Sequence, residues 1–284
     1  KRGILKTLNT WHEAYSNLAY LLKEFYQQQN NKKEVPQRLY SLLMYESEFL
    51  ELNPWIKKSE ESGKRDRLDP IHIFASFNYN KIYDSTLFNK LKYYTDKLSN
   101  ELNVTPAILG NDINFEGIPR LNITKLMGNR TLEHQQEIWR IFVGSFSNKK
   151  NLFIQIGFKK FNNWYGIQRA SFTCFLFWID STTFISLDQN TTLLLKKYKR
   201  MEIETFDDYR KLLNYKQKDL FRNIVKIAYD NTLQDRLSEY EKIVFEKFLD
   251  DNSMVDLNDI FQGMGLKKKI ETSAQFKILA IKAL

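Results

Sequence analysis

The sequence contains little of several residue types that would point to particular folds or cell compartments. Cys174 is the one cysteine among 284 residues, so no internal disulfide forms, and a thiol in an apolar segment favours a reducing, cytoplasmic setting. Only five prolines and ten glycines interrupt the chain, which favours helices over a turn-rich β fold. The longest apolar run, at 172–179, is far shorter than the ~20 residues that cross a bilayer. These features predict a soluble, mostly α-helical, multi-helix globular protein with no membrane partner.

Residues that commonly hold metals or cofactors are also sparse. None of the three histidines, His12, His72 and His134, has a neighbour at metal-ligand spacing, so we predict no metal site. The chain has no phosphate-binding loop, dinucleotide fingerprint or nucleophile elbow, so we predict no cofactor. A Cys-His nucleophile pair is disfavoured because the single thiol lies in an apolar helix.

Apolar residues recur every three or four positions over much of the chain, which predicts amphipathic helices. A short buried helical turn is expected after Asp69-Pro70, and a structural role is expected for His72. Turn-forming residues crowd 105–130 and predict a long loop that lines a site, with Asn114 and Phe115 as candidate contacts to a base. The C-terminal residues 274–284 are expected to form a strand or docked tail. Helices are predicted at 5–29, 39–52, 86–102, 133–146, 168–179, 240–249 and, with a break near Asn214, 206–228.

These patterns divide the chain into four regions. An N-terminal helix and linker occupy 1–34, and a helical region that includes the long loop occupies 35–148. Residues 149–232 form a hairpin-containing region, and 233–284 form a C-terminal helix and tail, with minor β structure expected at the end.

The stretch 162–200 contains the motif on which the interpretation of the rest of the chain depends. A turn at Tyr165-Gly166 precedes an almost wholly apolar helix, and a short extended piece then presents Asp188 before a second helix with a basic end. Residues 149–200 contain nine basic and two acidic side chains, a net charge of +7, whereas the whole chain carries +9. Such concentration of positive charge is typical of a surface that meets a polyanion, although basic flanks are also common on ordinary solvent-facing helices.

This stretch resembles the helix-hairpin-helix motif of the DNA glycosylase superfamily that includes the oxoguanine and adenine glycosylases. The resemblance covers about forty residues and rests on Gly166-Ile167-Gln168-Arg169-Ala170, the apolar helix, and Leu187-Asp188-Gln189-Asn190, with Asp188 located 22 residues after Gly166. In that family the hairpin amides bind a DNA phosphate, and the aspartate faces the sugar of a flipped nucleotide. The resemblance implies a catalytic Asp188, which would stabilise positive charge on the sugar and orient the attacking water.

The same resemblance implies further site residues and shows two departures from the family. Gln168 replaces the usual second hairpin glycine, and Arg169 stands where lyase-competent members place a nucleophilic lysine, so the implied activity is that of a monofunctional glycosylase. The implied contacts to the DNA backbone are Gly166, Gln168, Arg169, Lys196, Lys197, Lys199 and Arg200. A flipped base would stack in a pocket that contains Trp164, Tyr165 and Trp178, together with Asn114 and Phe115.

Other interpretations of the same residues stay open. Asp188 equally fits a helix N-cap, because aspartate is a favoured cap for structural reasons alone. The chain then reads as a non-catalytic DNA-reading module of a restriction or phage-defence system, which would work with a partner nuclease or ATPase domain. A helical scaffold with a fortuitous hairpin pattern is a third interpretation. In the glycosylase and DNA-reading interpretations, the partner is DNA, double-stranded and in some cases modified.

Overall fold

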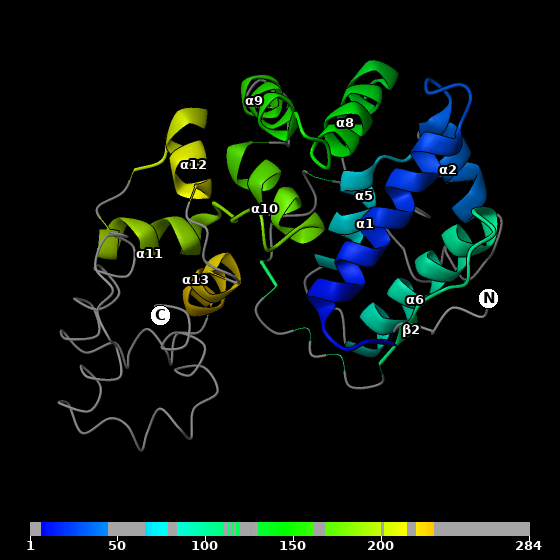
Figure 1. Ribbon diagram of the computed structural model, residues 1–284, viewed down its shortest axis with the longest axis horizontal. Coiled ribbons are helices and arrows are strands. Elements are labelled where there is room, and N and C mark those ends of the chain that lie inside the picture. The colour runs from blue at the N-terminus through cyan, green and yellow to red at the C-terminus, as the bar shows by residue number, and fades with distance from the viewer. Residues whose placement is uncertain are drawn as a thin grey trace. The chain divides into compact units, whose positions relative to one another are not determined.

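The computed structural model confirms a mostly α-helical fold with minor strand content (Figure 1). It describes residues 7–44, 66–78, 84–110, 130–161, 168–199, 202–214 and 220–229, with Ile113, Phe115, Ile118, Pro119 and Leu126 between them. The chain forms two compact units, Lys1–Asp180 and Ser181–Leu284. The boundary therefore falls inside the region 149–232 that the sequence grouped together, and it separates the predicted hairpin helix from Asp188.

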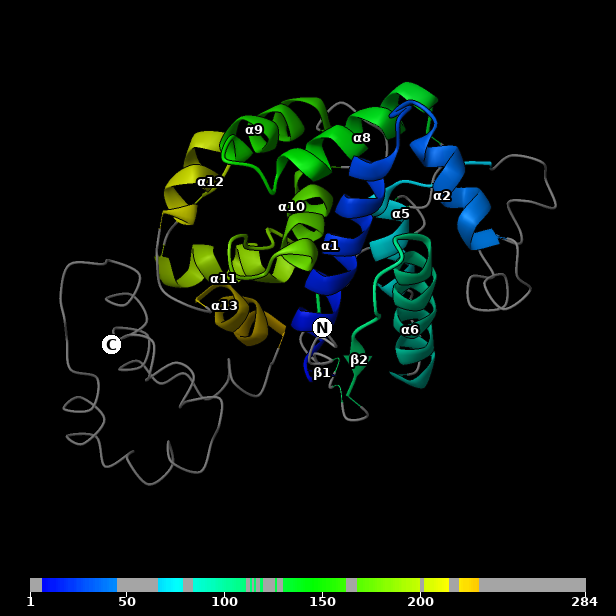
Figure 2. The same ribbon diagram turned by 45° about the vertical axis from the view of Figure 1, so that its right-hand side comes forward.

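Helix α1 (Trp11–Gln28) is the central element of the first unit. It begins at Thr10, whose hydroxyl accepts the Glu13 amide at 3.2 Å while the Glu13 carboxylate accepts the Thr10 amide. This capping box satisfies backbone donors that the first helical turn leaves open. At the other end, the Lys32 ammonium donates to three backbone carbonyls, including that of Tyr26 at 2.7 Å, and complements the negative end of the helix. Helix α1 packs against α6 (Asp84–Glu101), α8 (Leu132–Gly144) and α10 (Arg169–Ile179), as Figures 1 and 2 show.

Shorter elements surround this centre. Helix α5 (Pro70–Ala75) packs on α8 and α10 and continues into the 3-10 helix η1 (Ser76–Asn78), while α2 (Val35–Met44) packs on α8 and α6. Helix α9 (Lys150–Phe161), which the sequence pattern did not predict, packs on α8 and α10. Strands β1 (Thr7–Leu8) and β2 (Ile108–Leu109) pair in parallel as a small two-stranded sheet.

Aromatic side chains fill the core of the first unit. Tyr15 of α1, Phe74 of α5 and Phe175 of α10 are at most 1% exposed, and the Phe74 ring contacts both others edge-on. Each such burial contributes roughly 1.5–3 kcal/mol. Gly157 allows α9 to approach α10 closely, because a Cβ there would lie 2.2 Å from the Phe172 ring. The helices around α1 are therefore fixed by ring packing.

The described part of the second unit contains α11 (Gln189–Lys199), α12 (Phe206–Leu213) and α13 (Leu220–Tyr229), and α11 packs on α13. Two side-chain hydrogen bonds join α12 and α13 to the segment that precedes α11. The Tyr209 hydroxyl donates to the Ile185 carbonyl at 2.8 Å, and the Arg222 guanidinium donates to the Ser181 hydroxyl at 2.7 Å. Tyr209 and Arg222 thus hold the chain segment from which Asp188 projects.

Most predicted helices are confirmed. Those at 86–102, 133–146 and 168–179 appear as α6, α8 and α10, and the expected break near Asn214 follows the end of α12. The helix predicted at 5–29 appears as α1, but its predicted start is wrong, because Thr7–Leu8 form strand β1 and the helix begins at Trp11. The described part of the helix predicted at 39–52 belongs to α2. The short buried turn after Asp69-Pro70 is α5, capped by the Asp69 carboxylate. The predictions for 240–249 and 274–284 lie outside the described residues.

Candidate nucleic-acid interface

Asp188, the predicted catalytic residue, is the N-cap of α11. One carboxylate oxygen accepts the backbone amides of Asn190 at 3.0 Å and Thr191 at 3.1 Å. The other accepts the hydroxyls of Ser186 at 2.5 Å and Thr191 at 3.0 Å. The residue is only 3% exposed. Both oxygens are thus engaged in capping, and the geometry gives no support to a carboxylate that faces a bound sugar.

The hairpin residues lie at the start of α10. Gln168 is the N-cap of this helix but makes no side-chain cap hydrogen bond, and it is exposed. Arg169, the first helical residue, is half-buried. Gly166, Trp164 and Tyr165 lie outside the described residues. Gln168 and Arg169 belong to the first unit, and Asp188 belongs to the second.

The remaining predicted site residues divide between the core and the surface. Trp178 and Phe115 are 1% and 4% exposed, so their packing does not support the predicted role in an open base pocket. Asn114 lies outside the described residues. Lys196 is exposed and its ammonium lies 2.5 Å from the Glu202 carboxylate. The side chains of Lys197 and Lys199, and the whole of Arg200, are also outside what the structure describes.

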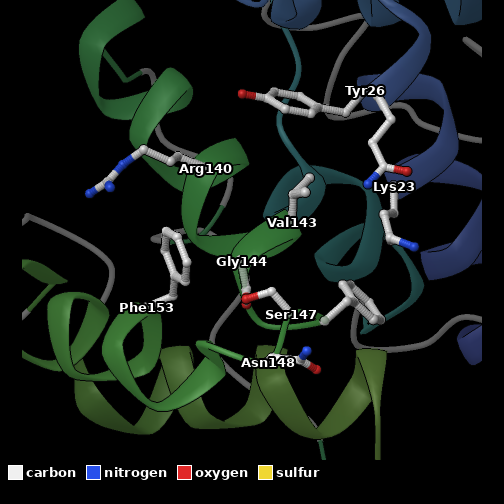
Figure 3. Close-up of a pocket in the computed structure, with 10 residues that line it drawn as sticks. Lys23, Tyr26, Arg140, Val143, Gly144, Ser147, Asn148 and Phe153 are labelled. Carbon is white, nitrogen blue, oxygen red and sulfur yellow. The ribbon is translucent and has the colours of Figure 1, made fainter.

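An open groove in the first unit is a stronger candidate site, and sequence reasoning missed it. It encloses about 570 Å³, within the range of ~300–1,000 Å³ that is usual for small-ligand pockets. Helix α1, the C-terminal part of α8, the turn after α8 and the start of α9 form its walls (Figure 3). Its lining consists of Lys23, Tyr26, Gln27, Arg140, Val143, Gly144, Phe146, Ser147, Asn148 and Phe153.

The charged side chains that line this groove are all positive. Lys23 comes from α1 and Arg140 from α8, and no carboxylate is among the lining residues. The Lys23 ammonium lies 3.3 Å from the carboxylate of Glu24, which is outside the lining. Arg140 makes a bidentate contact to Glu137, at 2.8 and 2.7 Å, and the Lys160 ammonium lies 2.7 Å from the same carboxylate. The hydrogen bonds from Arg140, reinforced by Lys160, lower the pKa of Glu137 to about 2 against the opposing effect of burial. Two cations share one carboxylate, so the cluster keeps a net positive charge.

Aromatic side chains form the apolar part of the groove. The Tyr26 ring stacks on Trp139, with centroids 5.5 Å apart and planes inclined by 18°, while the Lys32 ammonium lies 5.0 Å from its centroid. Burial raises the pKa of Tyr26 against the opposing charge of Arg140, so its hydroxyl stays a hydrogen-bond donor at neutral pH. Phe146 is 37% exposed. Its ring is therefore the large apolar surface that the groove offers to a ligand.

The turn between α8 and α9 extends the basic surface. The Ser147 hydroxyl donates to the Gly144 carbonyl at 2.7 Å and accepts the Lys149 amide at 3.1 Å, which fixes the turn. Lys149 follows Asn148 directly and is exposed, and Lys150 opens α9. Lys149 and Lys150 belong to the +7 stretch, so its charge was a usable sequence signal. The positive charge that α1 contributes could not be inferred from this stretch, because Lys23 lies far away in sequence.

Two ionisable groups elsewhere in the first unit are buried, and each has polar partners that give it a structural role. Asp69 is fully buried and lies 2.9 Å from Arg130 and 3.0 Å from the Nδ1 atom of His72. Burial opposes ionisation of Asp69, but Arg130 and His72 outweigh it and hold the pKa of the carboxyl well below its usual range. Lys90 is 1% exposed and donates to the Ser76 carbonyl at 2.9 Å. The predicted structural role of His72 fits this arrangement.

The fold and the groove define a mostly helical protein with a basic, aromatic-lined surface site. In the part of the chain that the structure describes, no cluster of three or more His, Cys, Asp or Glu side chains is placed to hold a metal ion. Nor does that part contain a helix of the length and apolarity that a bilayer crossing requires.

Comparison with known families places the chain in one of them. The family model described as "Domain of unknown function (DUF8425)" matches residues 11–235, most of the chain, and the protein belongs to this family. No curated protein and no solved structure matches it. The groove residues all lie within the matched range, so the site belongs to the family domain.

Proposed function

We propose that the protein is a DNA-binding module and that the groove, together with the basic turn after it, is its DNA contact. The observation that carries the proposal is an open hollow lined by Lys23, Arg140 and the accessible Phe146 ring, with no carboxylate in its lining. Positive side chains attract the phosphate backbone, and aromatic faces stack on bases. Lys149 and Lys150 extend the positive surface, and the net charge of +9 favours association with a polyanion.

A binding role without catalysis is consistent with the hydrogen bonds that occupy the Asp188 carboxylate. A glycosylase needs a carboxylate that reaches the sugar, whereas the Asp188 oxygens accept four hydrogen bonds from residues 186, 190 and 191. The proposed role is therefore the DNA-reading part of a cytoplasmic restriction or phage-defence system, in which a separate nuclease or ATPase supplies the catalytic step.

Fluorescence anisotropy with labelled DNA tests the proposal. The substrates are double- and single-stranded oligonucleotides with normal and modified bases, titrated at low and moderate salt. Reversing both groove cations, Lys23→Glu with Arg140→Glu, is expected to weaken binding by about tenfold or more at low salt, because phosphate neutralisation drives the association.

A matched control separates the groove from general charge effects. Arg38→Glu with Lys92→Glu makes the same change in net charge in the same unit, and each of these exposed cations also has one carboxylate partner, Glu101 and Asp96. The control is expected to bind much as the wild type does. Lys149→Glu with Lys150→Glu is a second test that preserves folding, because acidic side chains are favourable at the start of a helix.

Two results would overturn the proposal. One is the absence of DNA binding at low salt on every substrate. The other is an equal loss of affinity in the groove and control variants. Release of a base by the wild type, detected as strand cleavage after alkali, would instead restore the glycosylase hypothesis for Asp188.

A further inference from the structure

We infer that the groove holds a single unpaired nucleotide, so that the protein selects DNA with an exposed base over fully paired duplex. The inference rests on the proposed DNA-binding function and adds the form of DNA that the site accepts. It depends on the shape of the groove and on the exposed Phe146 ring. It also depends on hydrogen-bonding groups that make fewer bonds with the described residues than they could.

The size and walls of the groove suit a base. Its ~570 Å³ is a local hollow between α1 and the end of α8, closed at one side by the turn that carries Ser147 and Asn148 (Figure 3). In a duplex the base faces are covered by neighbouring base pairs, and only the backbone and groove edges are presented. A base that stacks on a protein ring must therefore be unpaired.

Phe146 offers that ring. It is the last aromatic residue before the turn, is 37% exposed, and packs edge-on against Phe142 with centroids 5.3 Å apart. Phe142 is itself buried, so Phe146 is held from one side while part of its surface stays open. The other two rings of the groove already have neighbours: Tyr26 stacks on Trp139, and the Arg140 guanidinium lies 5.6 Å over the Phe153 ring.

Polar groups with unused capacity complete the site. The Tyr26 hydroxyl makes no hydrogen bond with any described residue, and it projects from α1 toward α8 (Figure 3). Arg140 uses Nε and one terminal nitrogen on Glu137, which leaves its second terminal nitrogen to donate elsewhere. Lys23 and Arg140, from different walls of the groove, supply positive charge for the phosphates on either side of the nucleotide. Tyr26 and Asn148 supply hydrogen bonds to the sugar or base edge.

Competition anisotropy with defined DNA tests the inference on the full chain. The probes are a single-stranded oligonucleotide, a blunt duplex of the same sequence, and that duplex with one unpaired nucleotide in its centre. The single strand and the bulged duplex are expected to bind at least about fivefold tighter than the blunt duplex, as stacking of one base on an aromatic ring allows.

Variants assign the preference to the groove. Phe146→Ala is expected to weaken the binding of the single strand and of the bulged duplex by at least about fivefold, and so to remove most of the preference for unpaired DNA. Tyr26→Phe keeps the ring on Trp139 and removes only the hydroxyl, so a smaller loss is expected. Leu152→Ala, which truncates an apolar side chain that is 51% exposed and outside the groove, is the matched control and is expected to keep the preference.

The outcomes distinguish this inference from the proposed function. Equal affinity for blunt, bulged and single-stranded DNA, or a preference that survives Phe146→Ala, overturns the inference and leaves DNA binding in place. No binding of any DNA overturns both. A single-stranded RNA of the same sequence that binds better than the DNA would overturn the assignment of the ligand as DNA.

Discussion

The Asp188 carboxylate accepts both the backbone amide of Thr191 at 3.1 Å and its hydroxyl at 3.0 Å. These two bonds tie the start of α11 to the segment before it, in a place where the residue is almost fully buried. The residue that resembles a glycosylase aspartate is thus a buried helix cap, and its removal should lower the stability of the protein.

Asp188→Ala is expected to destabilise the protein by about 1–2 kcal/mol, because the first amides of α11 lose their acceptor. Asp188→Asn keeps one acceptor oxygen for those amides and is expected to cost less. Urea denaturation followed by circular dichroism measures both. If Asp188 were catalytic but did not stabilise the fold, both variants would be as stable as the wild type.

Lys90 is expected to make stability rise with pH. Burial lowers the pKa of its ammonium from 10.5 to about 7, so between these pH values the unfolded chain binds more protons than the folded one. The penalty is complete below about pH 7 and disappears as pH rises toward 10.5. Lys90→Met removes the cost, on the order of 1.4 kcal/mol for each pKa unit, and is expected to raise the melting temperature at pH 7 more than at pH 10. Equal shifts at both values would contradict this account.

The Asp69–Arg130 pair is expected to be far more sensitive than a surface pair. Arg130→Met leaves the fully buried Asp69 carboxylate without its guanidinium partner, and loss of one partner costs about 3–5 kcal/mol in comparable buried pairs. Arg38→Met, which breaks the exposed pair with Glu101, is expected to cost less than about 1 kcal/mol. Chemical denaturation at pH 7 compares the two. Since the folded-state pKa of Asp69 is lowered, the stability it contributes is also lost as pH falls, and Arg130→Met should flatten the acid limb of the stability curve.

Gly157→Ala tests the close approach of α9 and α10. The new Cβ would lie 2.2 Å from the Phe172 ring, which is fully buried and has little room to move. Overpacking of this kind typically costs about 1–3 kcal/mol. The thermal midpoint of the variant gives the answer, and a midpoint equal to that of the wild type would show that the ring relocates without strain.

The sequence predicted the helices better than the site, for a physical reason. Periodicity in α1 and the run of apolar residues in α10 are local signals, and both helices formed where expected. The buried residues of helix α9 do recur at helical spacing, at 154, 157, 158 and 161. The helix was missed because Gly157 takes one of these buried positions and because other apolar residues, such as Leu152 and Ile156, lie off the buried face and blur the pattern. The groove combines Lys23 with Arg140, which lie far apart in sequence. Only the packing of α1 against α8 brings their helices together.

The salt dependence of DNA affinity tests the central claim most directly. If Lys23, Arg140, Lys149 and Lys150 each neutralise a phosphate, the logarithm of the association constant for single-stranded DNA should fall with the logarithm of salt concentration with a slope of about −3. The variant that carries both Lys23→Glu and Arg140→Glu should have roughly half of that slope, because two of the four cations are removed. A wild-type slope near zero, or a slope that the groove variant leaves unchanged, would contradict the assignment of the groove as the DNA contact.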